Sequence, residues 1–309
     1  MNQIAILLST YNGEKFIKEQ LTSLAEQSYR EFDIYIRDDG SSDKTLEYID
    51  KFIQDSDLSI KLLSGDENVG ALLSFFTLLR EVSAIDRYGY IMFCDQDDIW
   101  LSNKVEISIE RMQELERSYP DLPLLIHSDL TVVDERLDTI DSSYWSYQQI
   151  DPTRTDLNHL LVENVITGCT TIINSNLAKL ALPIPTDAIM HDWWLGLVAT
   201  TLGKIDYIET STILYRQHSQ NEIGASKFGF DTVVQKISKL STPIFDRYIK
   251  QSKVLLDRYR DRLKPKDLDT LEAIVSIEYI PWYRGKMLLV KYNLSKRNFI
   301  KNIGLLLCR

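Results

Sequence analysis

The sequence contains few cysteines and no long apolar run. Three cysteines occur among 309 residues, Cys94, Cys169 and Cys308, and no two of them form a CxxC pair. This spacing argues against a disulfide framework and a cysteine-based zinc site, and it fits a reducing compartment. No apolar run approaches the roughly 18 to 20 residues that span a bilayer. The N-terminal MNQIAILLST lacks the basic segment and the apolar length of a signal peptide, so we expect a cytoplasmic protein.

Two common phosphate-binding loops are absent as well. Neither GxGxxG nor GxxxxGKS/T occurs, so the sequence predicts no dinucleotide site of that type and no P-loop.

Nucleic-acid binding is also disfavoured. Residues 1–225 hold 37 aspartates and glutamates against 17 lysines and arginines, and this acidic region would repel phosphate.

The charge is divided unevenly along the chain. Residues 226–309 hold 18 lysines and arginines against 8 aspartates and glutamates, although the whole chain has a formal charge of −10. The split predicts two regions, 1–225 and 226–309, with a boundary in the polar stretch QNEIGASKFG. The second region is expected to be helical, basic and amphipathic.

Strand and helix signals alternate in the first region. Hydrophobic runs predict strands and helical spacing predicts helices. The predicted strands are 4–10, 32–38, 60–64 and 90–94, and the predicted helices are 14–27, 45–53, 71–82 and 102–118, the last with Asn103 and Glu106 spaced as a capping box. Repeated strand–helix units predict an α/β fold with a mainly parallel, doubly wound sheet. Such sheets bind ligands beyond the carboxyl ends of their strands.

An acidic stretch, FCDQDDIW, ends the fourth predicted strand. Its carboxylates, Asp95, Asp97 and Asp98, lie close enough in sequence to repel one another unless a cation lies between them. One interpretation is a solvated, helix-capping loop, because aspartate favours turns. The other is a site for a hard divalent ion such as Mg²⁺ or Mn²⁺, which would bind a diphosphate. The place at the ligand-binding edge favours the metal site.

Polar residues also follow the first two predicted strands. Ser9 and Thr10 end the first strand, and Asp39 lies in the loop of IRDDGSSD after the second. We expect these residues and the acidic stretch to line one crevice. The loop is a strand-to-helix turn, and a carboxylate in it can also accept hydrogen bonds from a nucleoside base or ribose.

The order and spacing of these motifs resemble family-2 glycosyltransferases of the GT-A fold. Over residues 3–105 the resemblance is carried by LLSTYNGEKF, FDIYIRDDGSSDKT, ENVGALLSF and FCDQDDIW. The later segments NVITGCTTIIN, MHDWWLGLVA and LYRQHSQNEIGA resemble the bacterial rhamnosyltransferases that assemble cell-wall rhamnans and related surface polysaccharides. The resemblance implies a Rossmann-like, mainly parallel central sheet with flanking helices, in a catalytic domain at 1–225. The C-terminal helical region, 226–309, matches only loosely.

The resemblance also implies roles for single residues. Asp95 would lie near the ribose, Asp97 would bind the metal, and Asp98 would support or share that role. His218 would be a further metal ligand, the alternative being an imidazole with no ligand role. The nucleotide pocket would comprise Asp39 at the nucleobase, Ser9, Thr10 and Tyr11 beside it, and Asn68 and Gly70 near the diphosphate or sugar.

Asp192 precedes the apolar helix WWLGLVAT, where an aspartate favours an N-cap role. The resemblance implies a second role, as the general base that removes the proton of the acceptor hydroxyl in an inverting transfer. The family usually has Glu-Asp here, whereas this sequence has His191 before Asp192, a departure found in the rhamnosyltransferase subgroup. His191 would orient Asp192 or contact the acceptor. Arg216 would form either a diphosphate contact or a structural salt bridge.

The resemblance therefore predicts a glycosyltransferase that uses Mn²⁺ or Mg²⁺. The donor would be dTDP-β-L-rhamnose, with UDP-glucose, UDP-galactose and UDP-GlcNAc left open, and the acceptor a growing glycan on a polyprenyl diphosphate. A non-catalytic scaffold is an alternative. A nucleotidylyltransferase is disfavoured, because STYNGEKF stands where such enzymes carry a glycine-rich, lysine-containing loop. Interleaved apolar and basic residues in 226–309 predict peripheral contact with the anionic inner face of the cell membrane, against the alternative of a packed helical bundle.

Overall fold

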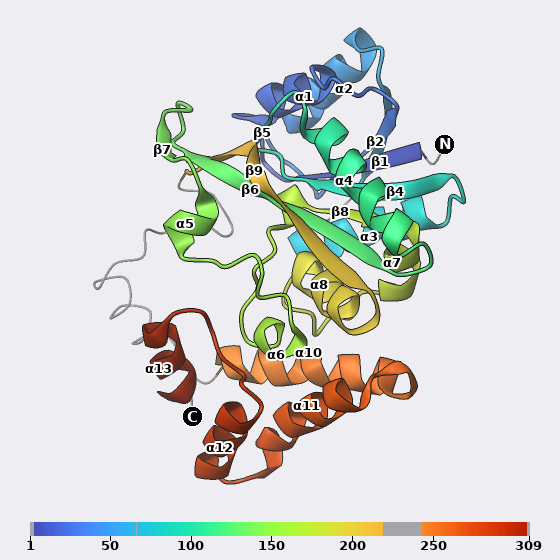
Figure 1. Ribbon diagram of the computed structural model, residues 1–309. Helices are drawn as coiled ribbons and strands as arrows, with labels where there is room; N and C mark the ends of the chain where they lie inside the picture. Colours follow the sequence, from blue (N-terminus) through green and yellow to red (C-terminus); the bar gives the residue numbers. More distant parts are fainter. Residues whose placement is uncertain (1–2, 66, 219–242, 308–309) are drawn as a thin grey trace.

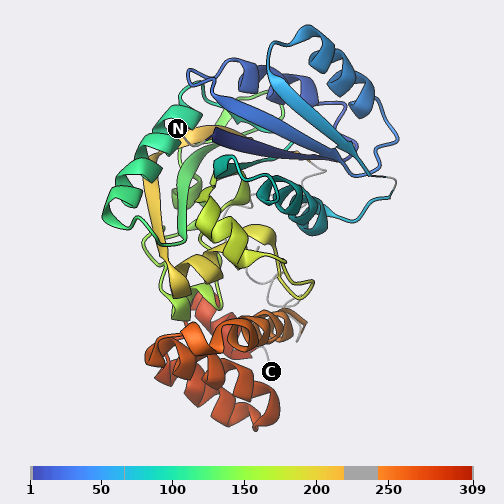
Figure 2. The same ribbon diagram turned by 90° about the vertical axis from the view of Figure 1, so that its right-hand side faces the viewer.

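The computed structural model describes residues 3–65, 67–218 and 243–307. These residues form one curled sheet with helices on both faces and a helical region below it (Figures 1 and 2). The predicted boundary between residues 225 and 226 lies outside the described ranges. None of the described helices is long and apolar enough to cross a lipid bilayer.

The sheet has nine strands, of which the first four in the sequence form a parallel half. The strands are β1 (Gln3–Thr10), β2 (Phe32–Asp38), β3 (Ser59–Ser64), β4 (Tyr88–Cys94), β5 (Ile99–Trp100), β6 (Leu124–Val133), β7 (Thr139–Asp141), β8 (Ile172–Asn174) and β9 (Lys204–Arg216). Their order is β3-β2-β1-β4-β8-β6-β9-β5, and β7 pairs with β6. β8 runs antiparallel to both β4 and β6, and β9 runs parallel to β6. The predicted mainly parallel α/β fold is confirmed.

Helices cover both faces of this sheet and form the region after it. Those of the sheet domain are α1 (Ile17–Ala25), α2 (Thr45–Asp55), α3 (Ala71–Ser83), α4 (Lys104–Ser118), α5 (Tyr144–Gln148), α6 (Leu157–Leu160), α7 (Ser175–Ala181) and α8 (His191–Leu202). Those of the helical region are α10 (Pro243–Tyr259), α11 (Pro265–Ser276), α12 (Trp282–Lys291) and α13 (Phe299–Leu307). Short 3₁₀ turns are formed by Gly168–Thr170, Arg260–Arg262 and Ile277–Tyr279.

The central strand β1 shows how the sheet divides the core. Its alternate side chains point to opposite faces of the sheet. Ile4, Ile6 and Leu8 pack with residues of α1 and α4 on one face. Ala5 and Leu7 pack with residues of α3, α7 and α8 on the other. All five are fully buried, so β1 is covered on both sides and the loops at its end are held in place.

Two predictions about helix starts are wrong. Asn103 is the N-cap of α4 without a side-chain cap bond, and Glu106 accepts a hydrogen bond from Ser28 Oγ at 2.7 Å. The predicted capping box is therefore wrong, because Glu106 takes a partner far away in the sequence. The N-cap interpretation of Asp192 is also wrong, since α8 begins at His191 and its N-cap is Met190.

The helical region packs firmly on the sheet domain through α10. The rings of Trp193 and Tyr248 lie 5.5 Å apart, and Tyr259 donates a hydrogen bond to Leu180 O at 2.7 Å. Near the chain end, Lys301 forms a 3.0 Å ion pair with Glu163. The part of the C-terminal region that the structure describes, residues 243–307, therefore makes packing contacts with the sheet domain, as the packed-bundle alternative expects.

Candidate active site

Three polar loops meet at the carboxyl edge of the parallel half-sheet. Thr10 pairs with Asp38 in the register of β1 and β2, and β1 also pairs with β4. Beyond the strands, the backbone of Tyr11 exchanges two hydrogen bonds with the Gln96 side chain, each 2.9 Å long. The Tyr11 side chain itself is exposed. The loops after β1, β2 and β4 therefore meet at one edge of the sheet, as their strand ends predict.

Asp38 holds two of these loops together. Its buried carboxylate accepts hydrogen bonds from Thr10 Oγ1 at 3.0 Å and from the backbone N–H groups of Gly40 and Ser41 at 3.1 and 2.8 Å. Ser41 Oγ adds a fourth at 2.6 Å. Thr10, predicted to line the nucleotide pocket, thus serves here as a donor to Asp38. Asp38 is a structural carboxylate that shapes the turn.

Asp39, predicted to contact the nucleobase, anchors the loop before α3. Its buried carboxylate forms an ion pair with Arg37 and accepts hydrogen bonds from Val69 N at 3.0 Å and Gly70 N at 2.8 Å. Gly70 has a φ of 80°, in the left-handed region that favours glycine. The turn that presents both N–H groups to Asp39 therefore depends on this glycine.

The other predicted pocket residues join the same group. Ser9 Oγ lies 2.6 Å from Ser74 Oγ, and Ser74 also accepts a hydrogen bond from Arg37 at 3.1 Å. Asn68 Oδ1 accepts a hydrogen bond from Gly70 N at 3.0 Å. A hydrogen-bonded network thus connects the ends of β1 and β2 with the start of α3.

A hollow of about 280 Å³ extends from this network toward Asp192. It lies between the starts of α3 and α8 and is lined by Val69, Gly70, Ala71, Leu72, Leu73, Thr186, Ile189, Met190 and Arg247. A hollow of about 300 Å³ lies elsewhere, between α6, α8 and α11, and includes none of the predicted site residues. Size alone therefore does not identify the site, and the smaller hollow adjoins the candidate chemistry.

The acidic loop turns its two last carboxylates to different sides. Asp97 Oδ2 lies 2.8 Å from His218 Nε2, and the His218 ring packs on Phe16 with a centroid separation of 4.6 Å. The two side chains come from opposite parts of the sequence, yet they form a pair of oxygen and imidazole nitrogen donors. Both were predicted as metal ligands, and the structure brings them together.

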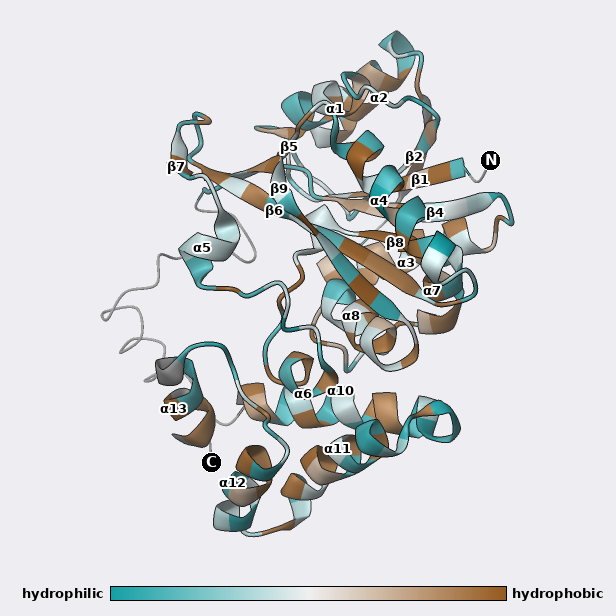
Figure 3. Cartoon of the chain, in the orientation of Figure 1, coloured by the Kyte–Doolittle hydropathy of each residue, from teal (hydrophilic) through white to brown (hydrophobic). Residues whose placement is uncertain are grey.

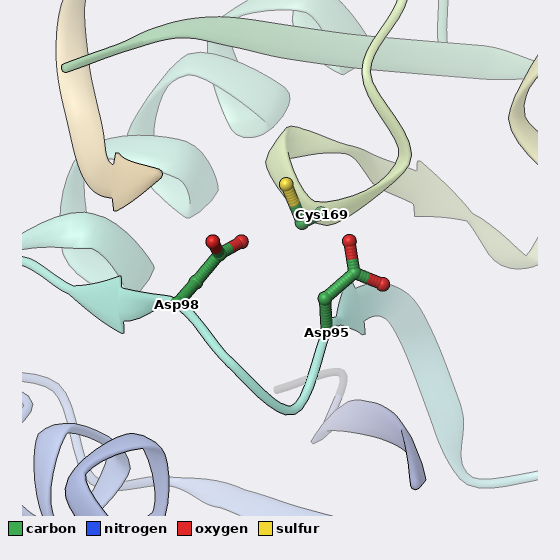
Figure 4. A group of neighbouring side chains, drawn as sticks. All are labelled: Asp95, Asp98 and Cys169. Atoms are coloured by element: carbon green, nitrogen blue, oxygen red, sulfur yellow. The ribbon is translucent and has the colours of Figure 1, made fainter. Parts of the chain in front are cut away.

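Asp98 points into the protein instead. It is fully buried and accepts hydrogen bonds from Arg216 N at 3.2 Å and from the Cys169 thiol. Carboxylate oxygens of Asp95 and Asp98 and the sulfur of Cys169 all lie within 4.8 Å of one another. Figure 4 shows the three side chains pointing toward one another. Burial, followed by the charges of Asp97 and Asp95, raises the pKa of Asp98 well above its usual value. Within the described residues, Asp98 Oδ2 has no hydrogen-bond partner.

Sequence reasoning missed the buried cation behind this loop. Lys104, in the first turn of α4, is fully buried, and its Nζ lies 4.6 Å from the centre of the Trp100 ring. Burial lowers the pKa of Lys104 to about 8, whereas the neighbouring Cys169, Cys94 and Asp98 act in the opposite direction. Its only sequence signal is a lysine in the first turn of the helix after the acidic loop.

Two roles were left open for Arg216, a contact to the diphosphate and a structural salt bridge, and the structure shows the salt bridge. Its buried guanidinium donates hydrogen bonds to Asp97 O at 3.0 Å and Glu135 O at 2.7 Å, and it forms an ion pair with Glu19. It also lies 4.7 Å from the centre of the Phe16 ring. Arg216 therefore ties the end of β9 to the acidic loop and to α1.

Asp192 lies in the first turn of α8, where it is 7% exposed. Its carboxylate accepts hydrogen bonds from Trp193 N at 2.6 Å, from Asn164 Nδ2 at 3.2 Å and from the backbone of Gly168. Gly168 directly precedes Cys169, so one short turn joins Asp192 to the group of Asp95 and Asp98. Burial raises the pKa of Asp192 to about 6, against the lowering effect of these hydrogen bonds.

His191 does not orient Asp192 through a hydrogen bond. Its ring lies between Phe75 and Phe93, with centroid distances of 4.3 and 5.0 Å. Among the described residues neither ring nitrogen has a hydrogen-bond partner, and burial lowers the pKa of His191 to about 3. The imidazole is therefore a neutral core group under Gly168. The following tryptophans, Trp193 and Trp194, are buried core residues too.

Comparison with known proteins assigns the chain to a family. Residues 5–178 match the model of glycosyl transferase family 2. The chain belongs to glycosyl transferase family 2. Accordingly, it is a glycosyltransferase, and the predicted resemblance is confirmed.

Two curated relatives of this family-2 glycosyltransferase cover most of its length. The dTDP-rhamnosyl transferase RfbG of Shigella flexneri is 31% identical over 224 residues, which span 71% of this chain and 74% of the relative. A second, of Escherichia coli, is the UDP-Glc:alpha-D-GlcNAc-diphosphoundecaprenol beta-1,3-glucosyltransferase WfgD. It is 26% identical over 228 residues, which span 73% of this chain and 81% of the relative. The predicted likeness to rhamnosyltransferases is thus supported.

Solved structures confirm the GT-A fold of this glycosyltransferase. The structure of Staphylococcus aureus TarS 1–349 in complex with UDP has a TM-score of 0.58 at 16% identity, covering 93% of this chain and 75% of that one. The mannosyltransferase PcManGT of Pyrobaculum calidifontis, in complex with GDP-Man and Mn²⁺, has a TM-score of 0.56 at 14% identity, covering 98% and 78%. At this level of identity the likeness concerns the fold alone.

The raised pKa of Asp192 makes stability depend on pH. Because the folded-state pKa of about 6 exceeds the ordinary value of 3.8, the folded protein binds more protons between these values. The ionised Asp192 carboxylate therefore destabilises the folded protein fully above about pH 6 and not at all below pH 3.8. We predict that the unfolding free energy of the wild type, relative to Asp192→Asn, falls by about 3 kcal/mol across this range.

Urea unfolding at pH 4, 5, 6 and 7.5 measures this difference. The Asp121→Asn variant, which makes the same substitution at an exposed position, is measured alongside as the control. A difference between wild type and Asp192→Asn that stays constant from pH 4 to 7.5 would contradict the raised pKa.

Proposed function

We propose that this chain transfers L-rhamnose from dTDP-β-L-rhamnose to a growing cell-wall or capsular polysaccharide held on a lipid diphosphate. The transfer is metal-dependent and inverting, and Asp192 is its general base. The observation that carries the proposal is the place of Asp192, whose buried carboxylate lies beside Met190 at the hollow and is joined through Gly168 to the acidic group. The likeness to RfbG supports rhamnose as the sugar.

In the proposed step, the acceptor hydroxyl gives its proton to Asp192 while its oxygen attacks the anomeric carbon. The bond from that carbon to the diphosphate oxygen breaks, and its electron pair leaves with dTDP. Attack opposite the leaving group converts the β-linked donor into an α-linked product. A base with a pKa of about 6 is ionised at neutral pH and is stronger than an ordinary aspartate. Its hydrogen bonds to Trp193 and Asn164 keep the carboxylate oriented.

The network at the ends of β1 and β2 would bind the nucleotide. Asp95 would contact the ribose, and Tyr11, exposed at the rim, would lie beside the base. A direct contact between Asp39 and the base remains a prediction. The Asp39 oxygens accept from Arg37, Val69 and Gly70, and a carboxylate has about four acceptor positions, so one position is left for that contact.

Asp97 and His218 would hold Mn²⁺ or Mg²⁺. Their 2.8 Å contact supplies one oxygen and one imidazole nitrogen donor. Asp98, which was predicted to support or share this role, lies on the other side of the loop with Asp95 and Cys169. When bound, the ion would offset the negative charge that develops on the leaving diphosphate. Carboxylate oxygens suit both ions. The Mn²⁺ complexes of PcManGT and GalNAc-T7, which share the fold, support this assignment.

The metal assignment predicts that His218→Ala weakens Mn²⁺ binding at least about tenfold, because one direct ligand is lost. Calorimetric titration of Mn²⁺ into the protein, without donor, measures this affinity. His159→Ala is the matched control, because His159 lies on α6 away from the acidic loop. Equal Mn²⁺ affinities for wild type and His218→Ala would remove His218 from the site.

A UDP-sugar is the second candidate donor. WfgD, whose printed name states a UDP-Glc donor, is similar over almost the same share of this chain as RfbG. Its diphosphoundecaprenol acceptor supports a lipid-linked acceptor for either donor. We therefore place the protein on the cytoplasmic side of the membrane, at its surface.

A donor screen with a short rhamnosyl-lipid acceptor and Mn²⁺ separates these candidates. We expect release of dTDP from dTDP-rhamnose, and a loss of kcat of roughly 10²- to 10⁴-fold in Asp192→Asn, the range for general base catalysis. Asp121→Asn, at the opposite edge of the sheet, should keep the wild-type rate. If a UDP-sugar were turned over and dTDP-rhamnose were not, the donor would be the UDP-sugar. An unchanged rate for Asp192→Asn would reject the base.

A further inference from the structure

α12 and the 3₁₀ turn before it carry large apolar side chains on their outer face. We define the α12 face as Tyr279, Trp282, Tyr283, Met287 and Val290. These residues are between 50% and 74% exposed, and they form the largest group of exposed large hydrophobic residues near one another in the sequence among the described residues. Hydrophobic and hydrophilic residues alternate along this helix in Figure 3. An ordinary protein surface shows such residues singly, so this group indicates an interaction surface.

The helix is oriented by its opposite face. Gly285 and Leu289 are buried, and a Cβ added to Gly285 would lie 3.1 Å from Ile277 Cγ2. This close packing on the turn before α12 fixes its rotation. With 3.6 residues per turn, Tyr283, Met287 and Val290 then share the side that faces away from the bundle.

Cations border this apolar stripe on both sides. On a helical projection, Lys286 lies along one edge and Arg284 and Lys291 along the other. From residue 279 to the C-terminus the sequence holds seven lysines and arginines and no aspartate or glutamate. Within the described residues, no ion pair is formed by Arg284, Lys286 or Lys291, in contrast to Lys301, which pairs with Glu163.

We propose that the α12 face lies in the headgroup region of an anionic lipid bilayer. Tryptophan and tyrosine prefer this interface, because their rings are apolar and their polar atoms reach water. Lysine and arginine beside them are attracted by anionic headgroups. The proposal narrows the membrane contact from the whole C-terminal region to one helix, and it deepens the location given under the proposed function.

A second copy of the chain fits this face less well. In a symmetric dimer through α12, the same surface meets itself. Arg284, Lys286 and Lys291 of the two copies would then lie close to one another, with Glu278 the nearest acidic residue in the sequence, and like charges across an interface are unfavourable. α12 also lies at the end of the helical region away from the sheet, where a flat surface can approach it (Figures 1 and 2).

Trp282 makes this contact directly measurable. It is 57% exposed, whereas the other four tryptophans, at 100, 145, 193 and 194, are no more than 9% exposed. With phosphatidylglycerol–phosphatidylcholine vesicles and no donor, we expect a blue shift of tryptophan emission and protection from acrylamide. Vesicles of phosphatidylcholine alone should give neither. Trp282→Phe should lose the fluorescence change while the protein still sediments with anionic vesicles.

The charges are tested by Arg284→Gln, Lys286→Gln and Lys291→Gln combined. Each cation near an anionic surface contributes roughly fivefold to binding, so the triple variant should bind anionic vesicles roughly a hundredfold more weakly. Lys51→Gln, Lys61→Gln and Arg117→Gln combined, exposed on the sheet domain, form the matched control and should bind as the wild type does.

Three results would overturn the proposal. One is an unshifted Trp282 emission with anionic vesicles, and another is equal binding by the two triple variants. The third is a concentration-dependent dimer, seen by sedimentation without lipid, that Met287→Ser with Val290→Ser dissociates. Release of dTDP with a water-soluble acceptor should be unchanged in the α12 variants, so a failed membrane contact is distinguished from a failed glycosyl transfer.

Discussion

Buried aspartates bound by backbone N–H groups hold the candidate site together. Asp38, Asp39, Asp98 and Asp192 are each buried, and each accepts a hydrogen bond from a backbone N–H group in or next to a loop at this edge of the sheet. A buried carboxylate without such partners would strongly destabilise the fold, so every one of these loops has a fixed position relative to the sheet edge. Asp39, Asp98 and Asp192 have partners that are distant in the sequence, and these bonds join the end of β2 to the start of α3, the loop after β4 to the end of β9, and the start of α8 to the turn at Gly168.

The same burial separates the roles of the carboxylates. Asp98 and Asp192 are both buried, and burial raises the pKa of each. For Asp98 the neighbouring Asp97 and Asp95 add to the effect, and buried Lys104 lies behind the loop as a counter-charge. Asp192 has no acidic neighbour among the groups that shift its pKa, so its value of about 6 suits a base that is ionised at neutral pH. The acidic loop thus suits the binding of an ion and a diphosphate, and Asp192 nearby suits proton transfer.

Local pattern predicted much of this, and long-range contacts explain the rest. The run FDIYIRD predicted β2 over residues 32–38, and β2 has those bounds. Buried parallel strands are readable because their hydrophobicity is nearly continuous. The tie from Asp39 to Gly70 and the burial of Lys104 were not predicted, because both depend on residues brought together only by folding. The capping box failed for the same reason, since Glu106 takes Ser28 as its partner.

The account depends most on proton transfer to a buried Asp192. The decisive measurement is the pH dependence of kcat for the wild type at saturating donor, acceptor and Mn²⁺, compared with Asp192→Asn. The account predicts a rate that rises about tenfold per pH unit below pH 6 and is constant above it, with no such rise in the residual activity of the variant. A wild-type rate that is unchanged between pH 5 and pH 8 would contradict it.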